Sequence, residues 1–191
     1  SWIESKKRRF THVRPVHLQF ARLIHSFVGE EKKVLPIYGH KEDEKGFASL
    51  THDYTKGIEY DPMGEPLKIG PFTITFLKTV HSVPCYGMRI TDGECVIVYT
   101  ADTAYQEVWA EFAKDADLLI TDCNFYAGQD ASKAGHMTSS EGATIAEMAN
   151  VSEMILSHLP QFGDHSRLID EASQHFKGKI RLAYEGLVWK K

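Results

Sequence analysis

The sequence is poor in the features that mark secreted, disulfide-bonded and membrane-spanning proteins. Its three cysteines (Cys85, Cys95 and Cys123) are scattered and form no CxxC pair, which favours reduced thiols over a disulfide framework. No apolar run approaches the roughly 20 residues that span a bilayer. The first residues, "SWIESKKRRF", lack the apolar core of a secretory signal. We therefore expect a cytoplasmic protein with no membrane partner.

Strong charge, repeats and linkers are missing as well. The formal net charge is −4, which gives no general case for binding nucleic acid. No repeat, low-complexity tract or Pro/Gly-rich linker interrupts the chain. A length of 191 residues with 42% hydrophobic residues is enough for a sizeable core, so a single globular domain is expected.

Hairpin signals come early in the chain, and strands alternate with helices later. "PFTITFLKTVH" alternates apolar and polar residues as a half-buried strand does, and Asp92-Gly93 marks a hairpin turn. Helical spacing is predicted for residues 18–28, 104–115, 138–150 and 164–176, and strands for residues 34–40, 117–125, 153–158 and 179–189. The order predicts an α/β fold with mixed sheets and flanking helices.

Three predicted strands end on residues that can bind metal. They are His81, Asp102 and His158. Ligands gather at strand ends in layered α/β folds, and two imidazoles with a carboxylate suit zinc, manganese or iron. Each residue also has a simpler alternative: a backbone hydrogen bond for His81, a helix N-cap for Asp102, and a core position for His158.

A second pair lies in the same pattern. Asp122 ends another predicted strand, and His136 precedes a helix that begins with a capping-box spacing. A carboxylate can orient an imidazole so that it donates to an oxyanion or leaving group, which makes both residues catalytic candidates. The alternative is that His136 only caps nearby backbone.

Several segments in order resemble the metallo-β-lactamase superfamily, and within it the ribonuclease Z-like phosphodiesterase branch. The resemblance lies in "KTVHSVPCYGMRI", "YTADT", "ITDCNF", "AGHMTSSEGATIAEMA" and "ILSHLPQFGD". It implies an αβ/βα sandwich with a dinuclear metal centre, most simply zinc, with manganese as a second candidate.

The resemblance also implies a role for each candidate residue. His81 corresponds to the histidine that completes the first metal site, Asp102 to the bridging carboxylate, and His158 to the ligand that closes the second. His136 corresponds to the histidine near the scissile phosphate. Asp122 stands where ribonuclease Z has the glutamate of its "HEAT" motif, and here the chain reads "TDCN".

The implied activity is hydrolysis by a metal-bound hydroxide, most simply of a phosphodiester. Candidate substrates are small molecules, nucleotides and RNA, and a homodimer is expected. One alternative is a catalytically impaired fragment or a non-enzymatic interaction module. Another is a lactam or thioester hydrolase of the same superfamily.

One expected motif is missing. The superfamily signature HxHxDH should fall near residues 6–11, which read "KKRRFT". We therefore expect an N-terminally incomplete fold, with an atypical segment at 1–17 and a partial hydrolase domain at 18–191. Because the missing residues supply ligands to both metals, the chain is expected to bind one metal, or none, in place of two.

Overall fold

The computed structural model describes residues 34–191 and divides the chain into two compact units, Ser1–Gly64 and Glu65–Lys191. In the first unit, β1 (Leu35–Gly39) pairs in parallel with β2 (Thr55–Glu59), and α2 (Glu44–Ala48) lies between them in the chain. The predicted helix at 18–28 and the atypical segment at 1–17 lie outside the described residues. Whether residues 18–191 form one domain stays a prediction.

The second unit is built on a seven-stranded sheet with the strand order β3-β4-β5-β6-β7-β8-β9. Pairing is antiparallel from β3 to β6 and parallel from β6 to β9, so the predicted mixed sheet is confirmed. The strands are β3 (Leu67–Ile69), β4 (Phe72–Lys78), β5 (Tyr86–Thr91), β6 (Val96–Tyr99), β7 (Leu118–Asp122), β8 (Glu153–Ser157) and β9 (Lys179–Leu182).

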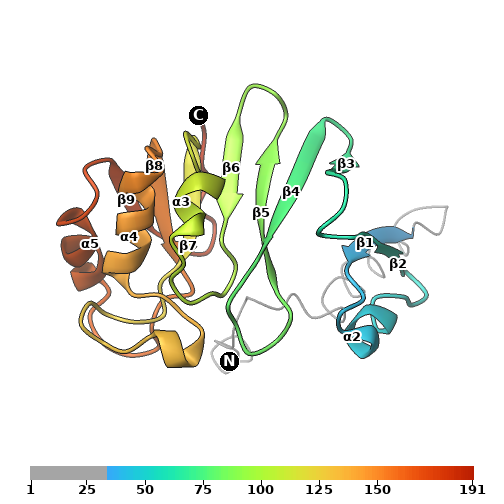
Figure 1. The fold of residues 1–191 in the computed structure, drawn as a ribbon, viewed down its shortest axis with the longest axis horizontal. Coiled ribbons are helices and arrows are strands. Elements are labelled where there is room, and N and C mark those ends of the chain that lie inside the picture. The colour runs from blue at the N-terminus through green and yellow to red at the C-terminus, as the bar shows by residue number, and fades with distance from the viewer. Residues whose placement is uncertain (1–33) are drawn as a thin grey trace. The chain divides into compact units, whose positions relative to one another are not determined.

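Three helices cover one face of this sheet (Figure 1): α3 (Val108–Phe112), α4 (Ser139–Met148) and α5 (Ser166–Ser173). Thr138 and Glu141 form the predicted capping box of α4. Among the described residues, no helix is both long enough and apolar enough to cross a membrane.

The predicted elements differ from the structure at their ends, and the difference is largest for three of them. The helix predicted at 104–115 shortens to α3, because the Ala104 N–H donates to the Val80 carbonyl and is not available to a helix there. The strand predicted at 179–189 ends at Leu182, before a turn closed by the Leu187 N–H and the Tyr184 carbonyl. The cap position of α5 is His165, although the carboxylate of the neighbouring Asp164 accepts from the Ser166 N–H.

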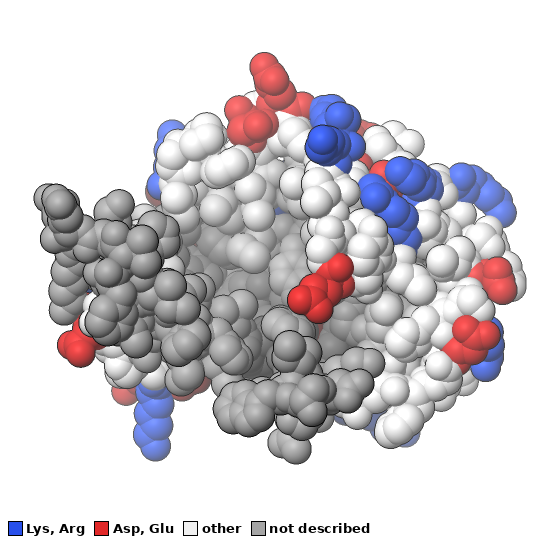
Figure 2. Space-filling model, turned by 180° about the vertical axis from the view of Figure 1, so that it is seen from behind, with Lys and Arg blue, Asp and Glu red and all other residues white. Residues whose placement is uncertain are grey.

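The main core lies between the sheet and its helices. It includes the fully buried side chains of Trp109, Leu119, Ile145, Leu156 and Leu168. Side chains alternate along a strand, so Ile120, which follows Leu119, faces the other side of the sheet. Ile120 is half-buried there, as are Ile90 and Ile97. Seen from behind, most of the described surface is neither acidic nor basic (Figure 2).

The topology brings particular strand ends together. The strands β4, β6, β7, β8 and β9 all run in one direction. Their carboxyl ends therefore lie along one side of the sheet, which we call its carboxyl edge. The candidate residues follow these ends: His81 after β4, Asp102 after β6, Asp122 as the last residue of β7, and His158 after β8. This edge is where ligands bind in open α/β sheets.

Candidate metal and catalytic site

The backbone turns sharply where two of the candidate residues leave their strands. Ala101, which precedes Asp102, has a φ of 55°, and His158 has a φ of 52°. Residues other than glycine rarely adopt this left-handed conformation, and such strain persists where surrounding structure holds it, often at functional sites. Both turns lie at the edge where the candidate residues gather, so they aim Asp102 and His158 into one place.

Three side chains at this edge form a cluster with metal-ligand chemistry. Asp102, His136 and His158 each offer a ligand atom, and these atoms all lie within 4.8 Å of one another. The side chains are 6%, 14% and 16% exposed, respectively, so the cluster is largely shielded from water yet still reachable. Two imidazoles and one carboxylate form a set that binds zinc and other divalent first-row metals and leaves positions open for water or substrate.

Asp122 lies behind His136 and orients it. The Asp122 side chain is fully buried, and its Oδ2 lies 2.8 Å from His136 Nδ1. The same oxygen accepts from the Thr103 N–H at 3.1 Å. When His136 donates through Nδ1, Nε2 remains as the nitrogen that can act in the site. The structure thus brings together the predicted pair of Asp122 and His136, and their catalytic roles stay a prediction.

The electrostatics of the cluster suit a cation. Asp102 Oδ1 and Asp122 Oδ1 are buried and accept no hydrogen bond from any residue that the structure describes. His158 Nδ1 lies 3.3 Å from each of these oxygens. Buried carboxylate oxygens are costly unless a positive charge or a donor compensates them. A divalent cation shared by this donor set would compensate them, so the residues present fit a metal.

His81 lies beside the cluster rather than within it. Its ring centroid is 5.1 Å from that of His136, and its Nδ1 lies 3.0 Å from the Gly135 carbonyl oxygen. A histidine that donates to a carbonyl in this way presents its other nitrogen as a ligand. Gly135 has a φ of 73°, and a Cβ there would lie 2.8 Å from His81 Nδ1, so only glycine fits this contact.

Sequence reasoning missed the residues that support the site through their backbone. Thr103 and Gly135 act through an N–H and a carbonyl, which every residue type carries, so composition could not single them out. Asn124 was also missed, and its Nδ2 donates to the His158 carbonyl at 2.9 Å. Gly135 alone gave a signal, as a glycine directly before His136.

The hydroxyl and thiol groups around the cluster are neutral. Burial, followed by the nearby carboxylate of Asp102, raises the pKa of Tyr99 to about 12. Burial also raises the pKa of Cys85, and it raises that of Cys123 much further. A thiol acts as a nucleophile only as the thiolate, so neither cysteine is suited to that role. Cys123 is buried and Cys85 half-buried, and both are free thiols.

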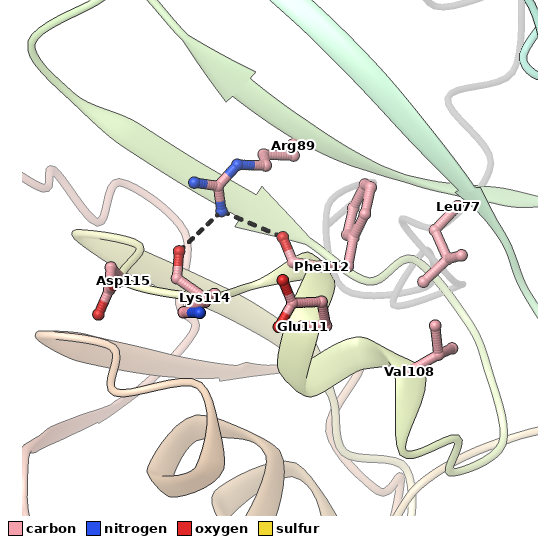
Figure 3. Close-up of a pocket in the computed structure, with 7 residues that line it drawn as sticks. All are labelled: Leu77, Arg89, Val108, Glu111, Phe112, Lys114 and Asp115. Atoms are coloured by element: carbon pink, nitrogen blue, oxygen red, sulfur yellow. Dashed lines mark hydrogen bonds between the residues drawn. The ribbon is translucent and has the colours of Figure 1, made fainter.

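A separate cavity of about 560 Å³ lies between α3 and the adjacent strands β4 and β5 (Figure 3). Its lining residues are Leu77, Arg89, Val108, Glu111, Phe112, Lys114 and Asp115, none of which belongs to the cluster. Arg89 Nη1 donates to the carbonyl oxygens of Phe112 and Lys114, each at 3.1 Å. The guanidinium therefore satisfies the end of α3, and this cavity has no direct link to the candidate chemistry.

The mixed sheet and the imidazoles and carboxylates at its carboxyl edge define the class as an α/β protein with a candidate metal site. Residues 21–159 match the family model described as the beta-lactamase superfamily domain. The chain is also 54% identical over 173 residues to the Bacillus subtilis (strain 168) protein named probable metallo-hydrolase YhfI, covering 90% of this chain and 70% of that one. The chain therefore belongs to the beta-lactamase superfamily.

Solved structures agree with this assignment. The crystal structure of the metallo-beta-lactamase fold protein YhfI from Bacillus subtilis superposes with a TM-score of 0.87 at 51% identity, covering 92% of this chain and 71% of that one. Human tRNase Z, short form, shares the fold with a TM-score of 0.64 at 18% identity, covering 91% of this chain and 73% of that one. The predicted fold class and the predicted family are both confirmed.

A relative named Ribonuclease Z, from Metallosphaera sedula, is 40% identical over 150 residues. The match covers 75% of this chain and 49% of the relative, so the chain spans about half the length of that protein.

Proposed function

We propose that the chain is the metal-binding and proton-transfer part of a phosphodiesterase that hydrolyses its substrate with metal-activated water. One observation carries the proposal: Asp102, His136 and His158 converge within 4.8 Å, with Asp122 hydrogen-bonded behind His136. This arrangement combines a cation site with an oriented proton carrier, which are the two parts that such a hydrolysis needs.

The residues divide into two roles in this proposal. Asp102 and His158 hold a divalent cation, zinc or manganese, and His81 is an additional ligand beside them. A cation held there supplies Lewis-acid activation of water and neutralises the charge that develops on the phosphoryl oxygens. Asp102 Oδ1, which is buried and accepts no hydrogen bond from a described residue, carries negative charge that would retain the cation.

His136 is the proposed general acid. In its protonated form, Nδ1–H donates to Asp122 Oδ2 while Nε2–H faces the site. As the bond between phosphorus and the leaving oxygen breaks, the proton on Nε2 moves to that oxygen and His136 becomes neutral. Asp122 orients the imidazole for this transfer, because its carboxylate oxygen lies 2.8 Å from His136 Nδ1.

The named relatives favour phosphorus over a carbonyl carbon as the centre attacked. Proteins named Ribonuclease Z are among the sequence relatives, and a diphosphatase from the PhnP family is among the structures that share the fold. A nucleotide or other phosphodiester is therefore the proposed substrate, with RNA as a larger candidate. The homodimer, the cytoplasmic location and the choice of zinc stay predictions.

The test is hydrolysis of bis(p-nitrophenyl) phosphate by the purified chain with added zinc or manganese, measured together with bound metal. We expect His136→Asn to lower turnover about 10²- to 10⁴-fold while leaving bound metal unchanged. Asp102→Asn should lose both turnover and metal. His175→Asn, on an exposed residue after α5, is the matched control and should change neither.

Each alternative predicts a different result. Loss of metal from His136→Asn would make His136 a ligand and would contradict its role as the acid. A wild-type chain that binds metal but hydrolyses nothing would support the non-enzymatic interaction module. Turnover of a lactam or thioester without turnover of the phosphodiester would support the other hydrolase.

A further inference from the structure

The segment that follows β8 carries an unusually exposed aromatic side chain. Phe162 is 84% exposed, the largest fraction among the large hydrophobic side chains in the described part of the chain. Leaving a phenyl ring in water forgoes the free energy of burying it, so a ring this exposed four positions after His158 invites a functional explanation.

The backbone that carries Phe162 is held in place on both sides. The Tyr126 hydroxyl donates to the Phe162 carbonyl at 3.1 Å, and His165 Nε2 lies 2.7 Å from the Pro160 carbonyl. Gly163 has a φ of 100°, and a Cβ there would lie 2.4 Å from the Tyr126 hydroxyl oxygen, so the loop packs tightly on this tyrosine. The exposed ring therefore projects from a pinned loop.

Tyr126, which holds the Phe162 loop, is itself held by a contact with another side chain. The Arg167 guanidinium lies 4.9 Å from the centroid of the Tyr126 ring. Tyr126 follows β7, whose last residue is Asp122, and the Phe162 loop follows β8 and begins at His158. The loop is thus anchored to the two strand ends that carry Asp122 and His158.

Phe162 is within reach of a substrate bound at the cluster. It lies four positions after His158 in the chain, and four Cα-to-Cα steps span at most about 14 Å. A second exposed aromatic, Tyr184, is 66% exposed and follows β9, which pairs with β8 through Leu156 and Leu182. The Ala183 N–H donates to the Leu156 carbonyl, so this second aromatic leaves the sheet at the same edge as His158.

We propose that Phe162, with Tyr184 beside the same edge, is the surface on which the nucleobase of a nucleotide phosphodiester stacks. The proposal rests on the proposed phosphodiesterase function and names the substrate class of that site. Any nucleobase gains free energy by stacking on an aromatic ring, and a loop whose backbone is already held loses little entropy on binding. Phe162 is therefore a specificity-determining residue and takes no part in the chemistry.

The test compares binding of adenosine 5′-monophosphate with binding of ribose 5-phosphate, which has the phosphate and the sugar but no base. Titrations of the metal-loaded chain followed by calorimetry give Kd for both. We expect adenosine 5′-monophosphate to bind wild type about tenfold more tightly than ribose 5-phosphate. Phe162→Ala should remove most of that difference without changing Kd for ribose 5-phosphate, and Phe162→Tyr should restore it.

The matched control is Phe72→Ala. Phe72 is also an exposed phenylalanine, at 44%, but it begins β4 and so lies at the opposite edge of the sheet. Its substitution should leave both Kd values unchanged. Equal binding of the two ligands by wild type, no binding of adenosine 5′-monophosphate, or an equal loss of both ligands in Phe162→Ala would overturn the inference.

The proposed function fails by a different measurement. If the metal-loaded chain shows no hydrolysis of bis(p-nitrophenyl) phosphate while Phe162→Ala still weakens binding of the nucleotide alone, the base-binding surface stands and the phosphodiesterase does not. If hydrolysis proceeds while Phe162→Ala binds both ligands as wild type does, the reverse holds.

Discussion

The two halves of the seven-stranded sheet differ in strand direction and in what their ends carry. In the antiparallel half, β3 to β5, successive strands end at opposite edges, and only β4 leads toward the site, with His81. In the parallel half, β6 to β9, every strand ends at one edge, and three of them supply Asp102, Asp122 and His158. Parallel strands thus bring the functional side chains that follow them to one edge, whereas successive antiparallel strands end at opposite edges.

The halves differ in burial as well. In the parallel half, β8 is buried along its first four residues, whereas the residues of β4 are half-buried or exposed. Helices α4 and α5 pack on β7, β8 and β9 of the parallel half, and the left-handed turns at Ala101 and His158 follow strands of this half. A site that depends on strained backbone needs such support, because the surrounding packing must hold the conformation.

The largest expected effect comes from removing the carboxylate that the parallel half places in the cluster. Asp102→Ala should lower metal-dependent hydrolysis of bis(p-nitrophenyl) phosphate by about a thousandfold or more, since loss of a metal ligand removes several kcal/mol of charge stabilisation. Kinetics of the variant and wild type at equal metal concentration measure it. Activity within tenfold of wild type would mean that the hydrolysis does not use this cluster.

The next effect compares the cores of the two halves. Leu156 in β8 is fully buried, and Leu156→Ala should lower the free energy of unfolding by about 3 kcal/mol. Ile90 in β5 is only half-buried, so Ile90→Ala should cost about half as much. Urea denaturation of both variants checks this order, and equal losses would remove the contrast between the two halves.

A smaller effect on activity is expected when Asp122 keeps its shape but loses its charge. Asp122→Asn should lower turnover about 10- to 100-fold, because partners that orient a functional histidine are worth that much. Bound metal should stay near the wild-type value if Asp122 acts only through His136. A large loss of metal would instead place Asp122 among the ligands.

The smallest effect concerns pH and a carboxylate away from the site. Burial raises the pKa of Glu171, but hydrogen bonds from the Ala127 N–H and the Ser139 hydroxyl, with the charge of Arg167, outweigh it and hold the pKa below its ordinary value. A lowered pKa stabilises the fold above the ordinary value, and the contribution is lost as pH falls through the folded pKa.

Glu171→Gln should therefore cost about 1 kcal/mol near pH 7, and its difference from wild type should shrink as the pH drops below about 4.5. Unfolding free energies measured from pH 7 to pH 3 check this. A difference that stays constant with pH would mean that the charge of Glu171 contributes nothing.

Much of the second unit could be predicted from the sequence because its signals are local. Asp92-Gly93 predicted the hairpin of β5 and β6, and the spacing of Thr138 and Glu141 predicted the start of α4. The short strand β3 was missed, since its three residues are too few to show a period. The shortened α3 was missed because the long-range bond between Ala104 and Val80 overrides local helical preference.

The candidate site could be predicted in part. Strand ends drew attention to His81, Asp102, Asp122 and His158, and the structure gathers all four at one edge. What the sequence could not give is which of them meet: the cluster of Asp102 and His158 is completed by His136, while His81 stands beside it. That arrangement depends on backbone contacts from Thr103 and Gly135. The Thr103 N–H has no sequence signature, and Gly135 is marked only by its place directly before His136.

The most direct test of the central claim is the zinc content of the purified chain after loading and exhaustive dialysis. Asp102 and His158 of this cluster predict about one tightly held equivalent per chain, lost in Asp102→Asn and retained in His136→Asn and His175→Asn. No retained zinc in wild type, or equal retention in Asp102→Asn, would contradict the assignment of this cluster as a metal site.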